Sequence, residues 1–270
     1  MMMILVRYGE IGLKGRPVRQ QFENILLRNI RRALSTAGIK HGTAKQRGRI
    51  YVDVEDDDRA LVVLRDVFGI VSLSPAIETS ADLTGITSAA ASFAVSFDFN
   101  ESFAIRATRT GSHDFTSQDI GIAAGQAIVD VTGAPVNLNT PDREIGVEVR
   151  DERSFLFDSV IDGPGGLPYG SQGLVVAAVA DEDDLKAAWL MMRRGCTTVF
   201  VCQLGMADAI PKMLQWRPAD ITICSDDVLD RAEALAEQRG DLRLVTGQER
   251  YQKRGLPVFY PLLGYWEVGI

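Results

Sequence analysis

The first part of the chain alternates short apolar runs with one long amphipathic stretch. Met3–Tyr8 is almost entirely apolar, which is typical of a buried strand. Between Val18 and Ala37 apolar side chains recur at helical spacing, and Gly38 is suited to end the predicted helix. The elements predicted next are strands at 39–45 and 48–54, a helix at 58–67 and a strand at 70–77. This βαββαβ order predicts a ferredoxin-like α+β domain over residues 1–78.

A second α/β region is predicted over residues 79–165. Its expected elements are a helix at 83–97, strands at 102–109, 144–150 and 154–158, and a helix that Thr116 or Ser117 caps. Along the first of these strands, one face is predicted to carry Phe103, Ile105 and Ala107, and the other Ala104, Arg106 and Thr108. Arg106 should therefore point away from the core.

From residue 166 onward the pattern becomes strand and helix in repetition. Strands are predicted at 174–180, 198–203, 221–224 and 242–246, and helices at 183–194, 207–215 and 226–238. The strand at 174–180 is apolar throughout, as a strand covered on both faces would be. This region, 166–270, predicts a doubly wound parallel sheet.

The net charge of −7 conceals an uneven distribution. Residues 1–50 carry 11 Lys and Arg against 2 Asp and Glu, a net charge of +9. The three following stretches, 51–100, 101–170 and 171–270, are net acidic at −7, −6 and −3. A basic end on an acidic protein indicates a local surface for a polyanion, with a solvated helix face as the alternative.

The sequence predicts a protein of the cytoplasm. No apolar run approaches the roughly 18–20 residues of a membrane span, and the opening methionines lead into a strand rather than a signal peptide. The three cysteines, Cys196, Cys202 and Cys224, lack metal-ligand spacing and suit a reducing compartment. We expect no membrane partner and no metal site.

The turn after the apolar strand at 174–180 has the architecture of a phosphate site but not its residues. Strand, tight turn and helix is the arrangement that binds nucleotide phosphates in α/β folds. Here the turn has no glycine, and Asp181, Glu182, Asp183 and Asp184 follow one another. These acids complement the helix N-terminus while repelling phosphate. An Mg²⁺ site is the alternative, but consecutive helical side chains point about 100° apart and do not converge.

Basic residues outside this turn are the candidates for phosphate contacts. They are Lys14, Arg16, Arg19, Arg106, Arg109 and Arg143, with the helix start at Ser117 offering backbone N–H groups. The alternative is that Arg106 or Arg109 pairs with an acid such as Glu148. The glycine- and proline-rich segment 163–170 is interpreted as a rigid interdomain turn rather than a phosphate loop.

Several motifs, taken in order, resemble one known family. Residues 102–106 (SFAIR) with Arg109, 115–119 (FTSQD), 136–138 (VNL) with Pro141, and 147–150 (VEVR) are similar to a THUMP domain, an RNA-binding module of tRNA-modifying enzymes. With the opening 7–15 (RYGEIGLKG) and the linker 163–168 (GPGGLP), they resemble the ThiI-type tRNA 4-thiouridine synthases, or tRNA sulfurtransferases. The resemblance extends from residue 4 to about 267. It implies tRNA as a partner, and a homodimer or a partner subunit of tRNA modification.

The resemblance also implies a PP-loop ATP-pyrophosphatase domain that adenylates tRNA with ATP and Mg²⁺. Its hallmark, Ser-Gly-Gly-x-Asp-Ser, falls on Val179, Ala180, Asp181, Glu182, Asp183 and Asp184, and only Asp183 matches. The glycine-, serine- and glutamine-rich loop that the family carries after the strand at 242–246 is also missing, since residues 245–249 (VTGQE) lead directly into 250–254 (RYQKR). We therefore expect a degenerate nucleotide site and no resident cofactor. The predicted function is tRNA binding without adenylation; the alternatives are an active sulfurtransferase with an atypical loop or partner subunit, and a scaffold without an RNA role.

Other candidates for chemistry are weaker. Cys224 is predicted at a strand end beside a helix start, a position that can activate a thiol, but Asp226 and Asp227 oppose this. A packed thiol is the alternative. His41 and His113 are expected to be surface loop residues without partners.

Overall fold

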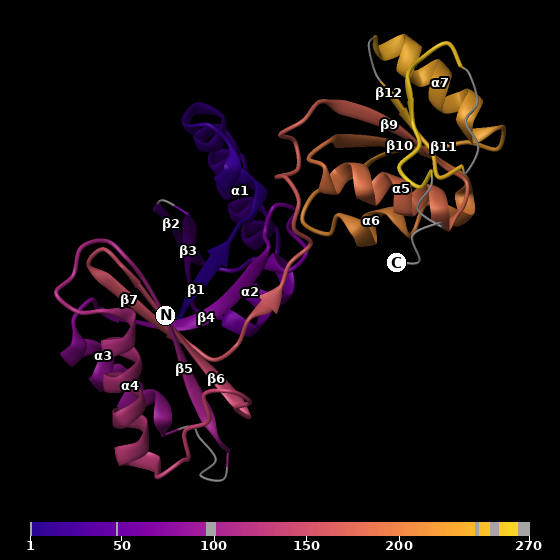
Figure 1. Cartoon of the computed structure of the whole chain (residues 1–270). Coiled ribbons are helices and arrows are strands. Elements are labelled where there is room, and N and C mark those ends of the chain that lie inside the picture. The colour runs from indigo at the N-terminus through magenta and orange to yellow at the C-terminus, as the bar shows by residue number, and fades with distance from the viewer. Residues whose placement is uncertain (1, 47, 96–100, 241–242, 249–253, 264–270) are drawn as a thin grey trace. The chain divides into compact units, whose positions relative to one another are not determined.

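The computed structural model describes all residues except 1, 47, 96–100, 241–242, 249–253 and 264–270. The chain divides into two compact units. The first contains Met1–Leu5, Tyr51–Asp57 and Ser74–Ile161, and the second contains Val6–Ile50, Asp58–Leu73 and Asp162–Ile270. The elements follow one another as in Figure 1. The predicted three-domain boundaries stay a prediction.

The helices and the longer strands of the N-terminal 162 residues follow the predicted order. They are β1 (Met2–Arg7), a 3-10 turn η1 (Glu10–Leu13), α1 (Arg16–Thr36), β2 (His41–Gln46), β3 (Arg49–Val54), α2 (Asp57–Leu64), β4 (Ser72–Ser80), α3 (Leu83–Ala94), β5 (Phe103–Thr110), α4 (Ser117–Thr132), β6 (Arg143–Arg150), β7 (Arg153–Phe157) and β8 (Ile161–Asp162). Their strands form one sheet in the order β2-β3-β1-β4-β7-β6-β5, with β8 paired to β4.

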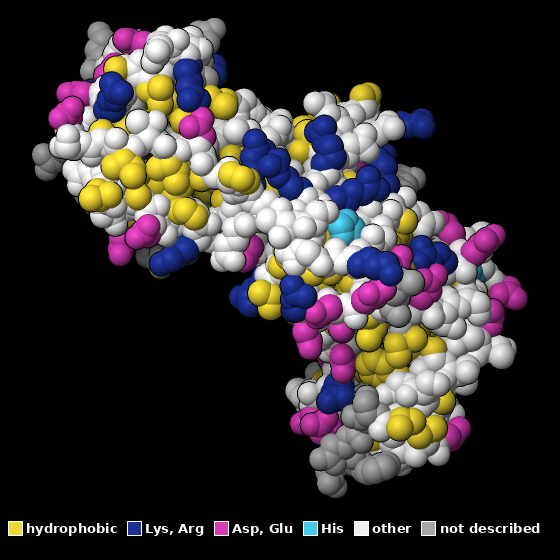
Figure 2. Space-filling model, turned by 180° about the vertical axis from the view of Figure 1, so that it is seen from behind, with side chains coloured by type: hydrophobic (Ala, Val, Ile, Leu, Met, Phe, Trp, Pro, Cys, Tyr) yellow, Lys and Arg dark blue, Asp and Glu magenta, His cyan; other side chains and the backbone are white. Residues whose placement is uncertain are grey.

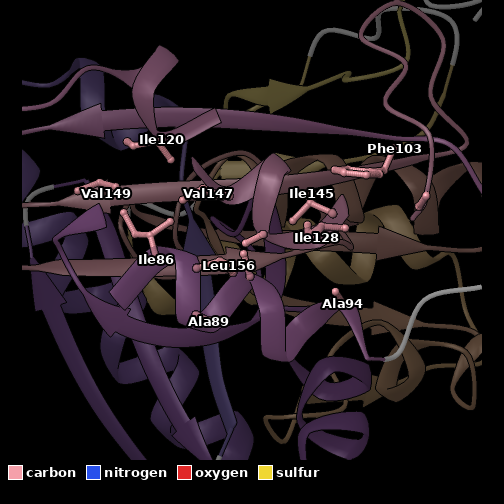
Figure 3. Close-up of a cluster of buried hydrophobic side chains, with 14 of the residues drawn as sticks. Ile86, Ala89, Ala94, Phe103, Ile120, Ile128, Ile145, Val147, Val149 and Leu156 are labelled. Carbon is pink, nitrogen blue, oxygen red and sulfur yellow. The ribbon is translucent and has the colours of Figure 1, made fainter. Parts of the chain in front are cut away.

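The first unit packs α3 and α4 on the strands β5, β6 and β7. Strands β5 and β6 run parallel, whereas β6 and β7 form an antiparallel hairpin. Figure 3 shows the core that results, where Ile86 of α3 and Ile128 of α4 lie against Ile145, Val147 and Leu156 of the strands. Arg106 is exposed while its neighbours Ile105 and Ala107 pack against this core, so the predicted outward position of Arg106 is confirmed. Ala104, which was predicted on the same outward face, is instead buried.

In the second unit, α1 buries the stripe that its periodicity predicts. Its buried side chains are Phe22, Ile25, Leu26, Asn29, Ile30, Ala33 and Leu34. All but Asn29 belong to the predicted apolar stripe, and the arginines at 28, 31 and 32 are exposed. The helix therefore presents one apolar face to the protein and one basic face to solvent.

The C-terminal elements of the second unit form the predicted doubly wound parallel sheet. They are β9 (Leu174–Val179), α5 (Glu182–Arg193), β10 (Thr197–Cys202), a 3-10 turn η2 (Leu204–Met206), α6 (Ile210–Met213), β11 (Asp220–Ile223), α7 (Val228–Arg239), β12 (Arg243–Val245) and β13 (Val258–Phe259). The strand order is β11-β10-β9-β12-β13, and every pair is parallel. Helices α5 and α7 cover opposite faces (Figure 1).

The strand order places a topological switch point between β9 and β12. From β9 the chain winds outward through β10 and β11, then returns to the other side of β9. In open α/β sheets, ligands bind outside the carboxyl ends of the strands at such a point. The turn after β9 and the residues after β12 meet there.

Two details differ from the sequence prediction. The helix predicted at 207–215 is only one turn long, from Ile210 to Met213. Its late start fits Pro211, which has no N–H to donate to the carbonyl of residue 207. The two-residue strands β8 and β13 were not predicted. The predicted helix end at Phe97, the strand start at Leu242 and the segment 249–253 lie outside the described residues. Within those that are described, no helix has the length and apolarity to cross a bilayer.

Candidate functional site

Lys14 and Arg16 lie at the junction between η1 and α1. Gly15 is the N-cap of α1 and Pro17 occupies its first turn, a position where a missing N–H costs nothing. Lys14 and Arg16 are both exposed. Neither has a charged partner among the residues that the structure describes. These two cations are open to an anionic ligand.

Arg19, one turn further along α1, belongs to a polar cluster beneath this junction. Its Nε lies 3.9 Å from Glu23 Oε1, and Lys45 Nζ lies 3.5 Å from Glu23 Oε2. Tyr8 donates its hydroxyl hydrogen to Glu23 Oε1 (2.6 Å) and accepts from the N–H of Gly48 (3.0 Å). Burial, followed by the Glu23 hydrogen bond, raises the pKa of Tyr8. The cluster connects α1 to β2 and to the residue that precedes β3.

The outer face of α1 extends the basic surface. Arg28 and Arg32 are exposed without a charged partner among the described residues. Arg31 donates from Nε to Thr43 Oγ1 of β2 (2.7 Å), which holds one guanidinium in place without neutralising it. Figure 2 shows Lys and Arg side chains gathered over α1.

In the first unit, Arg106 is paired, though not with the acid suggested by the sequence. Its Nη2 lies 2.6 Å from Glu144 Oε1 and also donates to the carbonyl of Leu138 (3.1 Å). Glu148 instead accepts from Arg150. The ion pair between Arg106 and Glu144 is solvent-exposed, so it is a weak competitor for a phosphate.

Arg143, at the start of β6, is half-buried among acids. Its Nε lies 3.4 Å from Glu101 Oε2 and its Nη1 lies 3.6 Å from Asp158 Oδ2. The charge of Arg143 is therefore shared with two carboxylates. It is the candidate least available to an outside anion.

Arg109 contacts the ring of His113, which the sequence did not predict. Its Nη1 contacts the carbonyl of Gly111 (3.3 Å) and Nδ1 of His113 (3.4 Å). On its other side, His113 places Nε2 2.6 Å from the carbonyl of Asp151 in the β6–β7 turn. The prediction that His113 lacks a partner is wrong, and so is the same prediction for His41, whose Nδ1 lies 2.8 Å from the carbonyl of Ile39.

The helix start at Ser117 is closed by its own cap. Thr116 is the N-cap: its hydroxyl accepts from the N–H of Asp119 (3.2 Å), and Asp119 Oδ2 accepts from the N–H of Thr116 (2.7 Å). This backbone hydrogen bond is the main cause that lowers the pKa of Asp119. A carboxylate already occupies this helix N-terminus, which reduces what Ser117 can offer an anion.

The turn between β9 and α5 is held by its own acids. Val179 is buried at the end of β9, and Asp181 is the N-cap of α5, where Oδ1 accepts from the N–H of Asp184 (2.9 Å). Glu182 is exposed and Asp183 is half-buried. Three further carboxylates therefore lie in the first helical turn, a position that the helix dipole favours.

Asp184 connects this turn to the end of β12. It is buried, with a relative exposure of 7%. One oxygen accepts from the N–H of Ala180 (3.0 Å); the other accepts from Thr246 Oγ1 (2.8 Å) and the N–H of Gly247 (2.6 Å). A Cβ at Gly247 would overlap the backbone of Asp183. The carboxylate thus fills the switch point between β9 and β12.

Cys202 and Cys224 lie at the carboxyl end of the parallel strands, whereas Cys196 lies at their amino end. Cys224 follows β11 and is half-buried, with Sγ 3.9 Å from the carbonyl of Asp226. Cys202 is the last residue of β10, and Cys196 is the residue immediately before the strand begins. Burial raises the pKa of the Cys196 and Cys202 thiols. No group of three or more His, Cys, Asp or Glu in the described ranges is arranged to hold a metal.

Comparison with known proteins relates this architecture to tRNA modification. Residues 3–74 match the ThiI ferredoxin-like domain and residues 80–157 match the THUMP domain. A probable tRNA sulfurtransferase of Methanothermobacter thermautotrophicus is 43% identical over 206 residues, which cover 73% of this chain and 51% of that one. The chain spans about half the length of the curated relatives it matches.

Two solved structures share the fold. The crystal structure of PH1313 from Pyrococcus horikoshii has a TM-score of 0.82 at 30% identity, covering 97% of this chain and 95% of the other. A 4-thiouridine synthetase, crystallised with RNA and bound ATP, has a TM-score of 0.74 at 23% identity, with 98% and 82% covered. The fold is that of a THUMP-containing α/β protein. The chain belongs to the family of ThiI-type tRNA sulfurtransferases.

Proposed function

We propose that the chain binds tRNA through its ferredoxin-like and THUMP regions and does not itself adenylate the RNA. The family it belongs to supports the first part, since its relatives are named as tRNA sulfurtransferases. The proposal that the chain does not adenylate RNA rests on one observation. The carboxylate of Asp184 accepts hydrogen bonds from the N–H groups of Ala180 and Gly247 and from the hydroxyl of Thr246, at the switch point. Whether the chain adenylates RNA therefore depends on whether the turn after β9 can bind a nucleotide phosphate.

A nucleotide phosphate at this turn would need the N–H groups that the acids now occupy. The N–H groups of Ala180, Asp184 and Gly247 donate to carboxylates of the turn. A carboxylate about 4 Å from a phosphate charge costs on the order of 4 kcal/mol at an effective dielectric near 20. The helix dipole offers only about 0.3–1 kcal/mol in return. The residues of this turn therefore do not fit ATP or Mg²⁺-pyrophosphate.

The basic side chains carry the RNA-binding part of the proposal. Lys14 and Arg16 are exposed without charged partners among the described residues, and Arg109 has no carboxylate partner there. Arg19 and Arg106 are held in exposed or half-exposed ion pairs that a phosphate can replace. Each phosphate contact releases counterions, so the predicted binding weakens as salt rises.

The RNA-binding part is tested by fluorescence anisotropy with a labelled tRNA over a range of salt. Replacing Lys14 and Arg16 together by Ala should lower affinity and reduce the slope of log affinity against log salt by about two. Arg239→Ala is the matched control, since this arginine is paired with Asp220 on the far sheet edge (3.0 Å). Equal slopes for all three proteins would refute the assignment of Lys14 and Arg16.

The adenylation part is tested by pyrophosphate release from ATP in the presence of tRNA and Mg²⁺. The expected result is release no faster than in a reaction without protein. Pyrophosphate formed in proportion to protein concentration would instead support an active sulfurtransferase, and this part of the proposal would fail. A tRNA affinity that is weak and independent of salt would favour a scaffold without an RNA role.

A further inference from the structure

A cavity of about 480 Å³ lies in the second unit, between the end of α5 and the segment that follows β12. Its walls come from Leu190, Met191, Arg193 and Arg194 of α5, from Phe259 to Pro261, and from Gly166 of the linker. None of the residues of the turn at 179–184 lines it. The volume is within the range of small-ligand sites, about 300–1,000 Å³.

Two guanidinium groups face this cavity without a neutralising partner. Arg193 and Arg194 are both exposed, and within the described part of the chain neither pairs with a carboxylate. Arg193 is oriented by Trp189, whose ring centre lies 5.7 Å from its guanidinium carbon. Planar guanidinium forks match the oxygens of a phosphate better than those of a neutral ligand.

The cavity is also lined by apolar side chains. Phe259 remains 39% exposed at the end of β13, and Leu190 and Met191 add apolar side chains to the cavity from α5. An exposed aromatic ring is a stacking surface for a nucleic-acid base, whatever the base is. Glu10, from η1, also lines the cavity and offers carboxylate oxygens to a hydroxyl or amino group.

The linker wall is built in a single conformation. Gly166 has a φ of +73°, and a Cβ there would overlap the carbonyl oxygen of Arg193. The same carbonyl accepts from the N–H of Leu167 (2.9 Å). Because the linker is fixed on the end of α5, the cavity exists before any ligand arrives, which lowers the entropic cost of binding.

We propose that this cavity binds a phosphorylated nucleoside, with the phosphate on Arg193 and Arg194 and the base against Phe259. A free nucleotide and an unpaired nucleotide of an RNA share this chemistry. The RNA source rests on the proposed tRNA-binding function, whereas the free nucleotide does not. Neither a free nucleotide nor a nucleotide of an RNA would contact the acidic turn after β9 when bound in this cavity, because no residue of that turn lines it.

The first experiment titrates the full chain with uridine 5′-monophosphate, adenosine 5′-monophosphate, uridine and inorganic phosphate, following Trp fluorescence. Both monophosphates should bind more tightly than uridine or phosphate alone. Arg193→Gln/Arg194→Gln should weaken the monophosphates by roughly tenfold or more, and Phe259→Ala should weaken them without changing phosphate. Arg239→Gln should change none of these affinities.

Two results would overturn the proposal. One is equal affinity of the wild-type chain and the Arg193→Gln/Arg194→Gln variant for every probe. The other is inorganic phosphate binding as tightly as either monophosphate, which would leave only an ion site. The replaced side chains are exposed, and an unchanged urea midpoint verifies that each variant is folded.

A second experiment separates the two sources and the two proposals. If the nucleotide comes from tRNA, adenosine or uridine monophosphate should compete with labelled tRNA, and the Arg193→Gln/Arg194→Gln variant should bind tRNA more weakly. Monophosphate binding without competition assigns the cavity to a free nucleotide. Salt-dependent tRNA binding with no monophosphate binding refutes the cavity proposal alone; monophosphate binding without tRNA binding refutes the proposed function alone.

Discussion

Replacing Asp184 by Ala should strongly destabilise the C-terminal sheet. The wild-type carboxylate is buried and accepts hydrogen bonds from two backbone N–H groups and from the hydroxyl of Thr246. Hydrogen bonds to a charged group contribute about 1.5–3 kcal/mol each. Part of this sum is offset because a buried carboxylate no longer has to be desolvated. We expect a loss of about 3–5 kcal/mol in the free energy of unfolding.

Urea unfolding followed by Trp fluorescence measures this loss, because all three tryptophans lie in the last hundred residues. Glu182→Ala is the matched control: it removes one carboxylate from the same turn, but this side chain is exposed, so a change within about 0.5 kcal/mol is expected. Thr246→Val, which removes one donor, should lie between the two. If Asp184→Ala costs no more than Glu182→Ala, Asp184 does not hold the turn.

Two further predictions concern single side chains. The folded pKa of Tyr8 is raised above its usual value of 10.0, so its stabilising effect is complete below pH 10 and is lost as pH rises beyond it. Tyr8→Phe should cost about 1 kcal/mol at pH 7, and urea midpoints above pH 10 should fall less steeply than in the wild type; parallel curves would contradict this. Among the cysteines, half-buried Cys224 should react with a thiol reagent before Cys196 and Cys202, whose thiols are buried and have raised pKa values; mass spectrometry of the labelled protein identifies the order.

Elements with strong periodicity could be predicted from the sequence. The apolar stripe of α1 and the uninterrupted apolar run of β9 depend on local pattern alone, and both are present as expected. The alternation in β5 likewise placed Arg106 outside the core. Local patterns succeed here because burial imposes a period of 3.6 on a helix and 2 on a strand facing solvent.

Contacts between distant residues could not be predicted in this way. In the register of β5 and β6, Arg106 lies opposite Gly146, so Glu144 and Glu148 flank it equally. Glu148 forms an ion pair with Arg150, and Glu144 forms one with Arg106. Neither the register nor the competing arginine can be read from the local sequence.

The same limit applied to the acidic turn. The lack of glycine and the four consecutive acids were visible in the sequence, and they predicted a turn that repels phosphate. Which acid matters was not visible, because the partners of Asp184 at Thr246 and Gly247 lie 62 and 63 residues away. Asp183 matches the family hallmark, whereas it is the buried carboxylate of Asp184 that connects the turn to Thr246 and Gly247.

This difference leads to a prediction about restoring the hallmark. Val179→Ser, Ala180→Gly and Asp181→Gly together would supply the missing small residues but leave Asp184 on the N–H groups of residues 180 and 247. We expect no ATP binding from this triple variant, and ATP binding only when Asp184→Ser is added, at a measurable loss of stability. The titrations use the Arg193→Gln/Arg194→Gln background, so that the cavity beside α5 contributes nothing. ATP binding to the triple variant would show that the glycines, and not Asp184, decide what this turn accepts; binding to neither would show that a further part of the nucleotide site is missing.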